Sequence, residues 1–313
     1  MATVLATLAG ALYVTPAAAQ ATGGDSIVPH FAWPVGAVAR VQYTQMIERE
    51  GNEDQPIHIE FEGEYTLHVH DHPSGLLVEY VDPLATRFRS SPVLAPDDPR
   101  RMVYSTIGMV VPDLVISRDG QLLGVDGLTT LASAITEVIG QQAPAADVQA
   151  IVGEMVNGPQ LLRTARERWN NQVAIWMDAV LRVGETGGGE ALEANPLIPS
   201  LVVPYEYQFT LLGVERCGPS GRSCAQIEIA SAHDPEELNR AMTEALASIG
   251  LGNLSFDGLV QESRVSLLTD PKTLLTHELT MSKRVQGILQ ENGQSRVFRR
   301  LDETHLIYTY DDG

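Results

Sequence analysis

The stretch IHIEFEGEYTLHV, at residues 57–69, alternates strictly between apolar and polar side chains. Its odd positions carry Ile, Phe, Tyr, Leu and Val around one glycine, and its even positions carry His, Glu and Thr. Successive side chains of a β-strand point to opposite faces, so this pattern predicts a long antiparallel strand with one buried face and one face in water. At 3.3 Å per residue the strand would be about 40 Å long, which favours strong twist and coiling.

The segments around this stretch predict further strands joined as meandering hairpins. Residues 38–50 place Val41, Tyr43 and Ile47 on one side, and residues 75–82 follow a turn with the sequence DHPSG. Further strands are predicted at residues 104–107, 113–125, 202–215, 223–230, 259–269, 273–285 and 296–310.

Between the two groups of predicted strands, apolar residues recur with the spacing of a helix instead of that of a strand. Apolar residues recur at three- and four-residue spacing in residues 128–138, 148–155 and 162–176, which predicts three helices. A fourth helix is predicted at residues 234–250, because Asp234 can cap it and Pro235 suits its first position.

This order of elements predicts an α+β fold, in which a long curved antiparallel sheet resembles half of a barrel and helices cover one face. The short echo between FEG at residues 61–63 and FDG at residues 256–258 leaves open whether two related halves are present. We place the first β half and its helices at residues 33–184, a Gly- and Pro-rich loop at residues 185–200, and the second half with one helix at residues 201–313. The halves are expected to pack as one unit.

The first 24 residues carry no charged side chain and combine an apolar run with the small residues TPAAAQ. This composition predicts a secretory signal peptide at residues 1–19, cleaved after Ala19, and then a flexible segment at residues 20–32. A membrane anchor is the alternative, but a span needs about 20 apolar residues and this run is shorter. We therefore expect a periplasmic or secreted protein without a stable membrane anchor.

The charge and the cysteines fit this location. A net charge of −19 argues against nucleic acids and anionic membrane surfaces as partners. The two cysteines, Cys217 and Cys224, flank the turn-rich sequence GPSGRS, which predicts a local hairpin disulfide in an exported protein.

The sequence HVHDH, at residues 68–72, is the one candidate metal cluster. His68 and His70 lie two positions apart and could present two imidazoles to one zinc ion. They share the polar face of the strand with several glutamates, however, and the position of His72 at the following turn cannot be derived. We interpret the cluster as exposed and not metal-binding, and a metal-dependent hydrolase using His68, His70 and His72 is the alternative.

No motif of another enzyme class is present. The chain lacks GxSxG, HExxH, SxxK and glycine-rich dinucleotide sequences, so no cofactor or catalytic residue is predicted.

The apolar faces of the predicted strands carry bulky aromatic side chains from both halves. Most of these would form an ordinary core, but a curved sheet that its helices close incompletely leaves an apolar pocket, which such side chains suit. The predicted ligand contacts are Tyr43, Phe61, Tyr65, Tyr207, Phe209 and His277. For His277, which shares a face with Leu275, Leu279 and Met281, the sequence favours a hydrogen-bonded core position over a ligand contact.

Three segments carry a resemblance to known proteins. They are VISRDGQLLGVDGL at residues 115–128, the spacing of Trp169, Trp176 and Gly184, and LLTDPKTLLTHELTMSKRVQG at residues 267–287. In style the chain resembles exported bacterial α+β proteins of unassigned function, and the last segment is similar to strands of periplasmic lipoprotein carriers of the LolA and LolB type. That resemblance implies a curved half-barrel, closed by helices, that holds lipid acyl chains.

The leading hypothesis is therefore an exported, non-enzymatic envelope protein that binds a hydrophobic, lipid-like ligand or a protein partner. Besides the hydrolase, a structural envelope protein is the remaining alternative.

Overall fold

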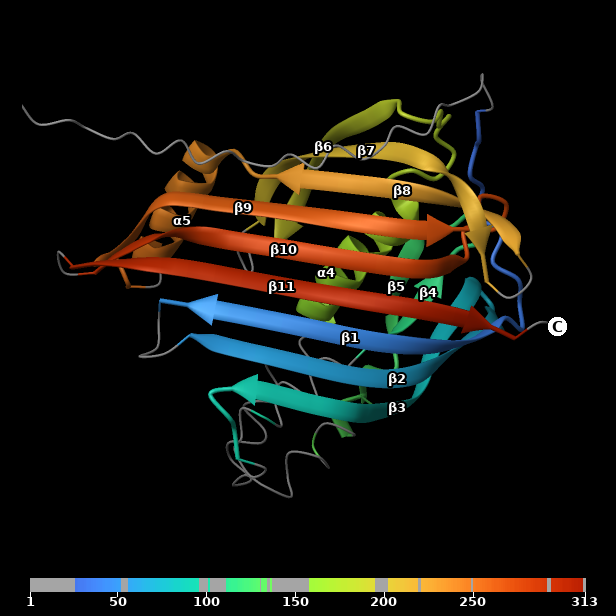
Figure 1. The fold of residues 1–313 in the computed structure, drawn as a ribbon, viewed down its shortest axis with the longest axis horizontal. Coiled ribbons are helices and arrows are strands. Elements are labelled where there is room, and N and C mark those ends of the chain that lie inside the picture. Colours follow the sequence, from blue (N-terminus) through green and yellow to red (C-terminus); the bar gives the residue numbers. More distant parts are fainter. Residues whose placement is uncertain are drawn as a thin grey trace, which may run out of the picture.

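The computed structural model describes residues 26–51, 56–95, 101, 111–129, 131–133, 136, 158–194, 202–218, 221–248, 250–291 and 294–311. These residues form one open antiparallel sheet of eleven strands in the order β5-β4-β3-β2-β1-β11-β10-β9-β8-β7-β6 (Figure 1). The strands are β1 (Val38–Glu50), β2 (Ile57–His72), β3 (Gly75–Ser91), β4 (Asp113–Ile116), β5 (Leu122–Asp126), β6 (Thr186–Ala194), β7 (Val202–Cys217), β8 (Arg222–Ala232), β9 (Leu254–Thr269), β10 (Thr276–Glu291) and β11 (Gln294–Tyr310). The predicted long antiparallel sheet is confirmed.

The strand β2 shows the predicted alternation. Its apolar side chains at odd positions, from Ile57 to Val69, are buried, and the polar ones between them remain partly exposed. We call the face that carries Phe61 and Tyr65 the inner face, and the face that carries Glu60 and Glu62 the outer face.

The two ends of the chain meet in the middle of the sheet. The strand β1 pairs with β2 on one side and with β11 on the other, in a register that sets Ala39 opposite Tyr310. The strands β1 to β5 therefore form one flank of the sheet and β6 to β11 the other, with β5 and β6 as the two open edges.

The chain passes from edge strand β5 to edge strand β6 across the inner face. This connection contains α4 (Gly158–Trp169), which contacts both edge strands, and the π-helical turn η1 (Asn170–Ala174). Figure 1 shows α4 behind the central strands. Its side chain Trp169, together with Val173 and Trp176, is buried in the main core against the sheet. The predicted helix at residues 162–176 is thus present, and its last turn is π-helical.

The other predicted helices are described to different extents. The helix α5 (Pro235–Ser248) begins as predicted, because the Asp234 carboxylate accepts hydrogen bonds from the backbone N–H groups of Glu236 and Glu237, both at 2.9 Å. It packs Leu238 and Met242 against a second core. Residues 128–138 are helical at the positions that the structure describes, and the predicted helix at residues 148–155 lies outside them. A complete helical cover of one face stays a prediction.

The predicted loop at residues 185–200 contains a strand instead. The edge strand β6 pairs with β7 along its whole length, because its glycines leave room for the aromatic side chains of β7. A Cβ atom on Gly187 would lie 2.4 Å from the Phe209 ring, and one on Gly189 would lie 3.0 Å from the Tyr207 hydroxyl. Composition alone indicated a loop, whereas these contacts require glycine within a strand.

The segment predicted to be flexible, residues 20–32, is fixed in its described part. Backbone hydrogen bonds join Ile27 to Leu181 and attach the N–H groups of His30 and Ala32 to the chain after β9. The Phe31 ring packs on the ring of Trp169, with 5.8 Å between centroids. The predicted strand at residues 104–107 lies outside the described residues.

The predicted disulfide between Cys217 and Cys224 is confirmed, and it joins the ends of β7 and β8. Within the part of the chain that the structure describes, no helix has the length and apolar character needed to span a membrane.

Candidate ligand-binding site on the inner face

The last turn of α4 places a cation among buried hydroxyl groups. The Nη2 atom of Arg168 donates to the hydroxyl oxygens of Tyr65 at 3.1 Å and Tyr308 at 3.4 Å. One helical turn later, the Gln172 side chain donates to the Thr276 hydroxyl at 2.9 Å and to the Tyr308 hydroxyl at 3.4 Å. The π-helical turn directs Gln172 inward, and its side chain is 4% exposed. Arg168 and Gln172 thus form a group of polar contacts next to the main core.

Five of the nine tyrosines form a group that includes the hydrogen-bond partners of Arg168, and they come from the central strands β1, β2, β3 and β11. They are Tyr43, Tyr65, Tyr80, Tyr308 and Tyr310. Burial raises the pKa of Tyr43, Tyr65, Tyr80 and Tyr310 far above the usual range. The charge of Arg168 lowers the pKa of Tyr43, Tyr65 and Tyr80, but by less than burial raises it. These phenols are therefore neutral hydrogen-bond donors at any physiological pH. We call Arg168 and the five tyrosines the tyrosine cluster.

A line of polar side chains crosses the inner face farther along the strands from this cluster. This line, which we call the polar band, consists of four residues in register across β8, β9, β10 and β11: Ser231, Ser263, Lys283 and Asp302. The Ser231 and Ser263 hydroxyls lie 2.6 Å apart, and Asp302 binds Arg300 with 2.6 Å between Oδ2 and Nη2.

Within the polar band, Lys283 is the residue whose pKa is shifted. Burial lowers the pKa of Lys283, while the carboxylate of Glu167 on α4 acts in the opposite direction. The neighbouring residues Glu167 and Arg168 therefore face different parts of the inner face, the first toward the polar band and the second toward the tyrosine cluster.

Next to the polar band runs a line of apolar side chains. Phe209, Ile229, Val265 and Met281 stand in register across β7, β8, β9 and β10, and we call them the apolar line. Ile229 and Val265 are buried, whereas Phe209 and Met281 at its two ends are partly exposed. Along the strands, the inner face thus changes from the tyrosine cluster to the apolar line and then to the polar band.

The predicted ligand contacts fall on this face in two groups. Tyr43, Phe61 and Tyr65 are buried in the main core, and the rings of Tyr43 and Phe61 lie 5.8 Å apart. Tyr207 and Phe209 lie over the glycines of β6 near the edge of the sheet and remain partly exposed. The structure places these five side chains on one face, and their contact with a ligand stays a prediction.

The predicted contact His277 lies at one end of the sheet. Its half-buried ring packs edge-on against Tyr310, with 5.3 Å between centroids, and burial lowers its pKa. Among the described residues it also belongs to the one group of three potential metal ligands, together with Cys217 and Cys224. Because both thiols are joined in the disulfide, this group is a structural contact.

Arg168 and Gln172 were not predicted from the sequence. The signal was available, because both stand on the side of the helix that also carries Ala165, at positions where an apolar residue would continue the buried stripe. A charged residue at a core position of an amphipathic helix is a strong indication of a buried polar contact.

The histidine cluster lies on the outer face, near the end of β2. The rings of His68 and His70 are stacked in parallel with 5.7 Å between centroids, and the His70 side chain is 48% exposed. His70 contacts Glu79 at 3.1 Å, and the His72 Nδ1 atom accepts the backbone N–H of Ser74. Each of His70 and His72 thus has a separate neighbour, and whether the cluster binds metal stays a prediction.

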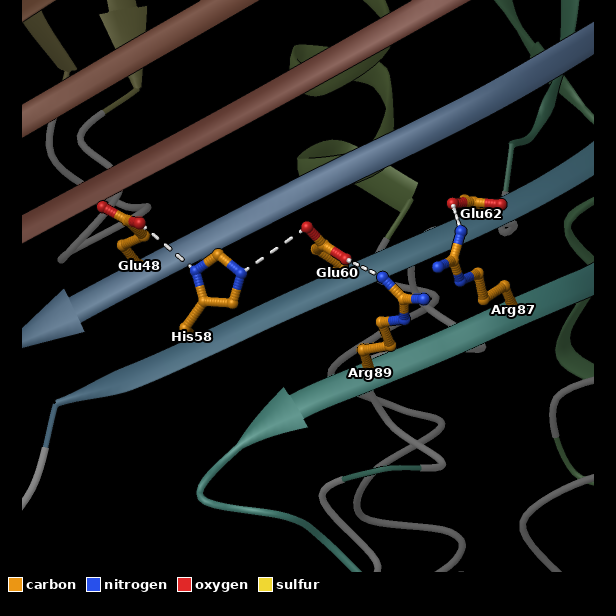
Figure 2. A network of polar contacts seen from close by, with 6 residues as sticks. All are labelled: Glu48, His58, Glu60, Glu62, Arg87 and Arg89. Carbon is orange, nitrogen blue, oxygen red and sulfur yellow. Dashed lines mark hydrogen bonds and ion pairs between the residues drawn. The ribbon is translucent and has the colours of Figure 1, made fainter.

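Toward the other end of β2, polar contacts and ion pairs within β2 and between β1, β2 and β3 lie on the outer face. Figure 2 shows His58 between Glu48 and Glu60, with Arg89 on the far side of Glu60 and a separate pair of Arg87 with Glu62. The shortest of these contacts, between Arg87 and Glu62, is 2.8 Å. Such exposed pairs stabilise a fold by about 0–1 kcal/mol each, so they provide mainly solubility and register.

The outer face also has a hollow of about 640 Å³ over β7 to β11. Small side chains such as Ala230 and Ala232 form its floor, and Glu206, Arg264 and Arg284 are among the residues at its walls. Its lining is polar and it opens broadly to solvent, which does not suit a hydrophobic ligand.

Comparisons with known proteins do not identify the chain. No protein-family model matches it, and no curated protein matches it by sequence. Among solved structures, a lipovitellin structure that concerns lipid–protein interactions aligns with a TM-score of 0.45 and 10% identity over 90% of this chain. The aligned part is 26% of the lipovitellin chain, so this chain spans about a quarter of that length.

A second solved structure is an outer membrane channel from Pseudomonas putida F1. It aligns with a TM-score of 0.21 and 11% identity over 92% of this chain and 100% of the channel. Both TM-scores lie below 0.5, so neither likeness defines the fold or the function of this chain.

Proposed function

We propose that the protein is an exported, non-enzymatic binding protein that holds a hydrophobic, lipid-like ligand on the inner face of its sheet. The observation that carries this proposal is the apolar line, because its ends Phe209 and Met281 remain partly exposed on the face that the chain crossing from β5 to β6 covers.

The physical reason is the cost of apolar surface in water. An acyl chain that lies against Phe209 or Met281 would cover this surface, and each methylene group that it buries contributes about 0.8 kcal/mol. In the part of the chain that the structure describes, β5 and β6 are the two edges of the sheet, and a chain-like ligand would enter there.

The test uses Met281 and Ser282, which are adjacent on β10 and lie on opposite faces of the sheet. We expect an uncharged apolar probe, N-phenyl-1-naphthylamine, to bind the wild-type protein with saturable fluorescence. Met281→Asp places a charge on the apolar line and should weaken this binding at least tenfold. Ser282→Asp places the same charge on the outer face of the same strand and should leave it unchanged.

Lipid extraction of the protein isolated from its own envelope, followed by mass spectrometry, gives the second measurement. Co-purifying lipid-like molecules in stoichiometric amount are expected. If the probe does not bind and no lipid is extracted, the ligand-binding proposal is wrong, and a protein-binding role replaces it. Circular dichroism of both variants verifies that they fold.

The exported location is tested separately. Amino-terminal sequencing of the protein from the cell envelope should begin at Gln20, the residue after the predicted cleavage position. A mature protein that retains residues 1–19 would contradict export by signal peptidase.

A further inference from the structure

The hydrogen-bond donors of the tyrosine cluster outnumber its acceptors. Arg168 and Gln172 donate to the oxygen atoms of Tyr65 and Tyr308, and each of these neutral phenols has a proton of its own to donate. Among the described residues no acceptor receives those protons. The Tyr310 hydroxyl is also buried without a hydrogen-bond partner in the described part of the chain. Buried polar groups generally find a partner, so an acceptor belongs here.

The charge of Arg168 leads to the same requirement. A guanidinium group stays ionised in proteins, and a buried ion without a counter-ion costs several kcal/mol. The Nε atom of Arg168 is shielded from solvent and makes no hydrogen bond with a described residue. The partners of its Nη2 atom are neutral phenols, which solvate the cation but do not neutralise it.

Two carboxylates that act on this cluster have other partners. Asp113 acts on the phenol of Tyr80, and its Oδ1 atom accepts the Tyr80 backbone N–H at 3.2 Å. Asp302 influences the phenol of Tyr43, but its Oδ2 atom pairs with Arg300 at 2.6 Å. Glu167, the neighbour of Arg168 on α4, acts on Lys283 on the polar band. Among the described residues, the groups whose charges act on Arg168 are tyrosines and not carboxylates.

We propose that the tyrosine cluster binds the carboxylate of a single-chain fatty acid, with Arg168 as the counter-ion and the hydroxyls of Tyr65, Tyr308 and Tyr310 as additional donors. This proposal rests on the proposed function and specifies the ligand class. A carboxylate accepts up to four hydrogen bonds and donates none, which matches a cluster that has only donors to offer. One guanidinium neutralises one negative charge, so the site favours a singly charged acid.

The apolar surroundings give the chain of such an acid a direction. From Arg168 the inner face leads over Tyr43, Leu306 and Leu279 to Met281, the partly exposed end of the apolar line. The acid group would therefore lie under α4, and the hydrocarbon chain would extend along the inner face toward β7. The aromatic side chains predicted from the sequence become contacts of the chain, and Arg168 becomes the contact of its head.

The test uses one fluorescent fatty acid in two charge states. Delipidated full-length protein is titrated with cis-parinaric acid and with its uncharged methyl ester. Wild-type protein should bind the acid at least tenfold more tightly than the ester. Arg168→Met keeps an unbranched but shorter side chain and removes the charge, and should abolish this preference while the ester binds as before. Arg166→Met, on an exposed position of the same helix, should behave as wild type.

A second variant covers the case in which Arg168→Met does not fold. The double substitution Tyr65→Phe with Tyr308→Phe keeps both rings and removes two hydroxyls, and should weaken acid binding at least threefold without affecting the ester. Equal affinities of wild-type protein for acid and ester would refute the head-group site and leave the proposed function intact. Binding of neither would refute both. Tighter, Arg168-dependent binding of lysophosphatidic acid would replace the carboxylate by a phosphate.

Discussion

The two faces of strand β2 use the same backbone for different purposes. On the inner face, Phe61 and Tyr65 are 1% and 3% exposed and pack into the main core. On the outer face, Glu60 and Glu62 form ion pairs with arginines of β3 in contact with water. Burial makes the inner face the source of stability, and charge makes the outer face the source of solubility. The charged groups that stand on or against the inner face, such as Arg168 and Lys283, therefore require a specific reason.

The largest effect is expected from adjacent substitutions on the two faces. Phe61→Ala removes a buried ring and should lower the free energy of unfolding by about 3–5 kcal/mol. Glu62→Ala removes one exposed ion pair with Arg87 and should change it by about 1 kcal/mol or less. Urea denaturation of both variants measures the difference. Similar losses for the two variants would contradict the division of roles between the faces.

A smaller effect is expected where the inner face reaches the edge of the sheet. Gly187→Ala would bring a Cβ atom to 2.4 Å from the Phe209 ring, and the resulting displacement should cost about 1–3 kcal/mol. Gly213→Ala is the control, because a Cβ atom there meets nothing within 4 Å. Thermal denaturation compares the two, and equal melting temperatures would show that the edge strand adapts without strain.

The smallest effect is expected in how the free energy of unfolding changes with pH when a histidine is removed from either face. His233 is 5% exposed on the inner side, where its Nδ1 atom donates to the Pro204 carbonyl and Gln261 contacts its Nε2 atom. Burial lowers the pKa of His233 below its ordinary value of 6.5, although the Pro204 carbonyl acts in the opposite direction. The stability that the neutral ring contributes is therefore present above pH 6.5 and is lost as the pH falls toward its folded-state pKa.

Denaturation between pH 7.5 and pH 5 checks this effect. Wild-type protein should lose more stability over this range than His233→Gln. His305→Gln removes a partly exposed ring beside Glu278 on the outer face and is the matched variant for comparison. A wild-type pH dependence in His233→Gln would mean that its ring is not the acid-sensitive group.

The sequence predicted most of the strands because their information is local. The alternation in residues 57–69 determines both the strand and its buried face, and Asp234 with Pro235 determines the start of α5. The hairpin disulfide was predictable for the same reason, since the turn lies within eight residues. The edge strand β6 was missed because glycines usually indicate a loop, and only the rings of Phe209 and Tyr207 explain their presence.

The candidate site was predictable only in part, because it depends on contacts between distant residues. Alternation placed Tyr43, Phe61 and Tyr65 on one face, but it could not show that α4 brings Arg168 to Tyr65. Nor could it show that β11 adds Tyr308 to the same cluster, since the pairing of β1 with β11 is not encoded in either strand alone.

The pairing of β1 with β11 has a consequence for how the chain reaches its fold. The central strand β1 acquires its second neighbour only when the last strand has been synthesised, because Ala39 pairs with Tyr310. Contacts between residues so distant in sequence slow folding, since the entropy of closing the intervening chain must be overcome first. Until that moment β1 presents an open edge that can pair with other chains. Folding of this protein is therefore expected to be slow and to be completed only once β11 is available, and loss of β11 alone would split its sheet into two separate flanks.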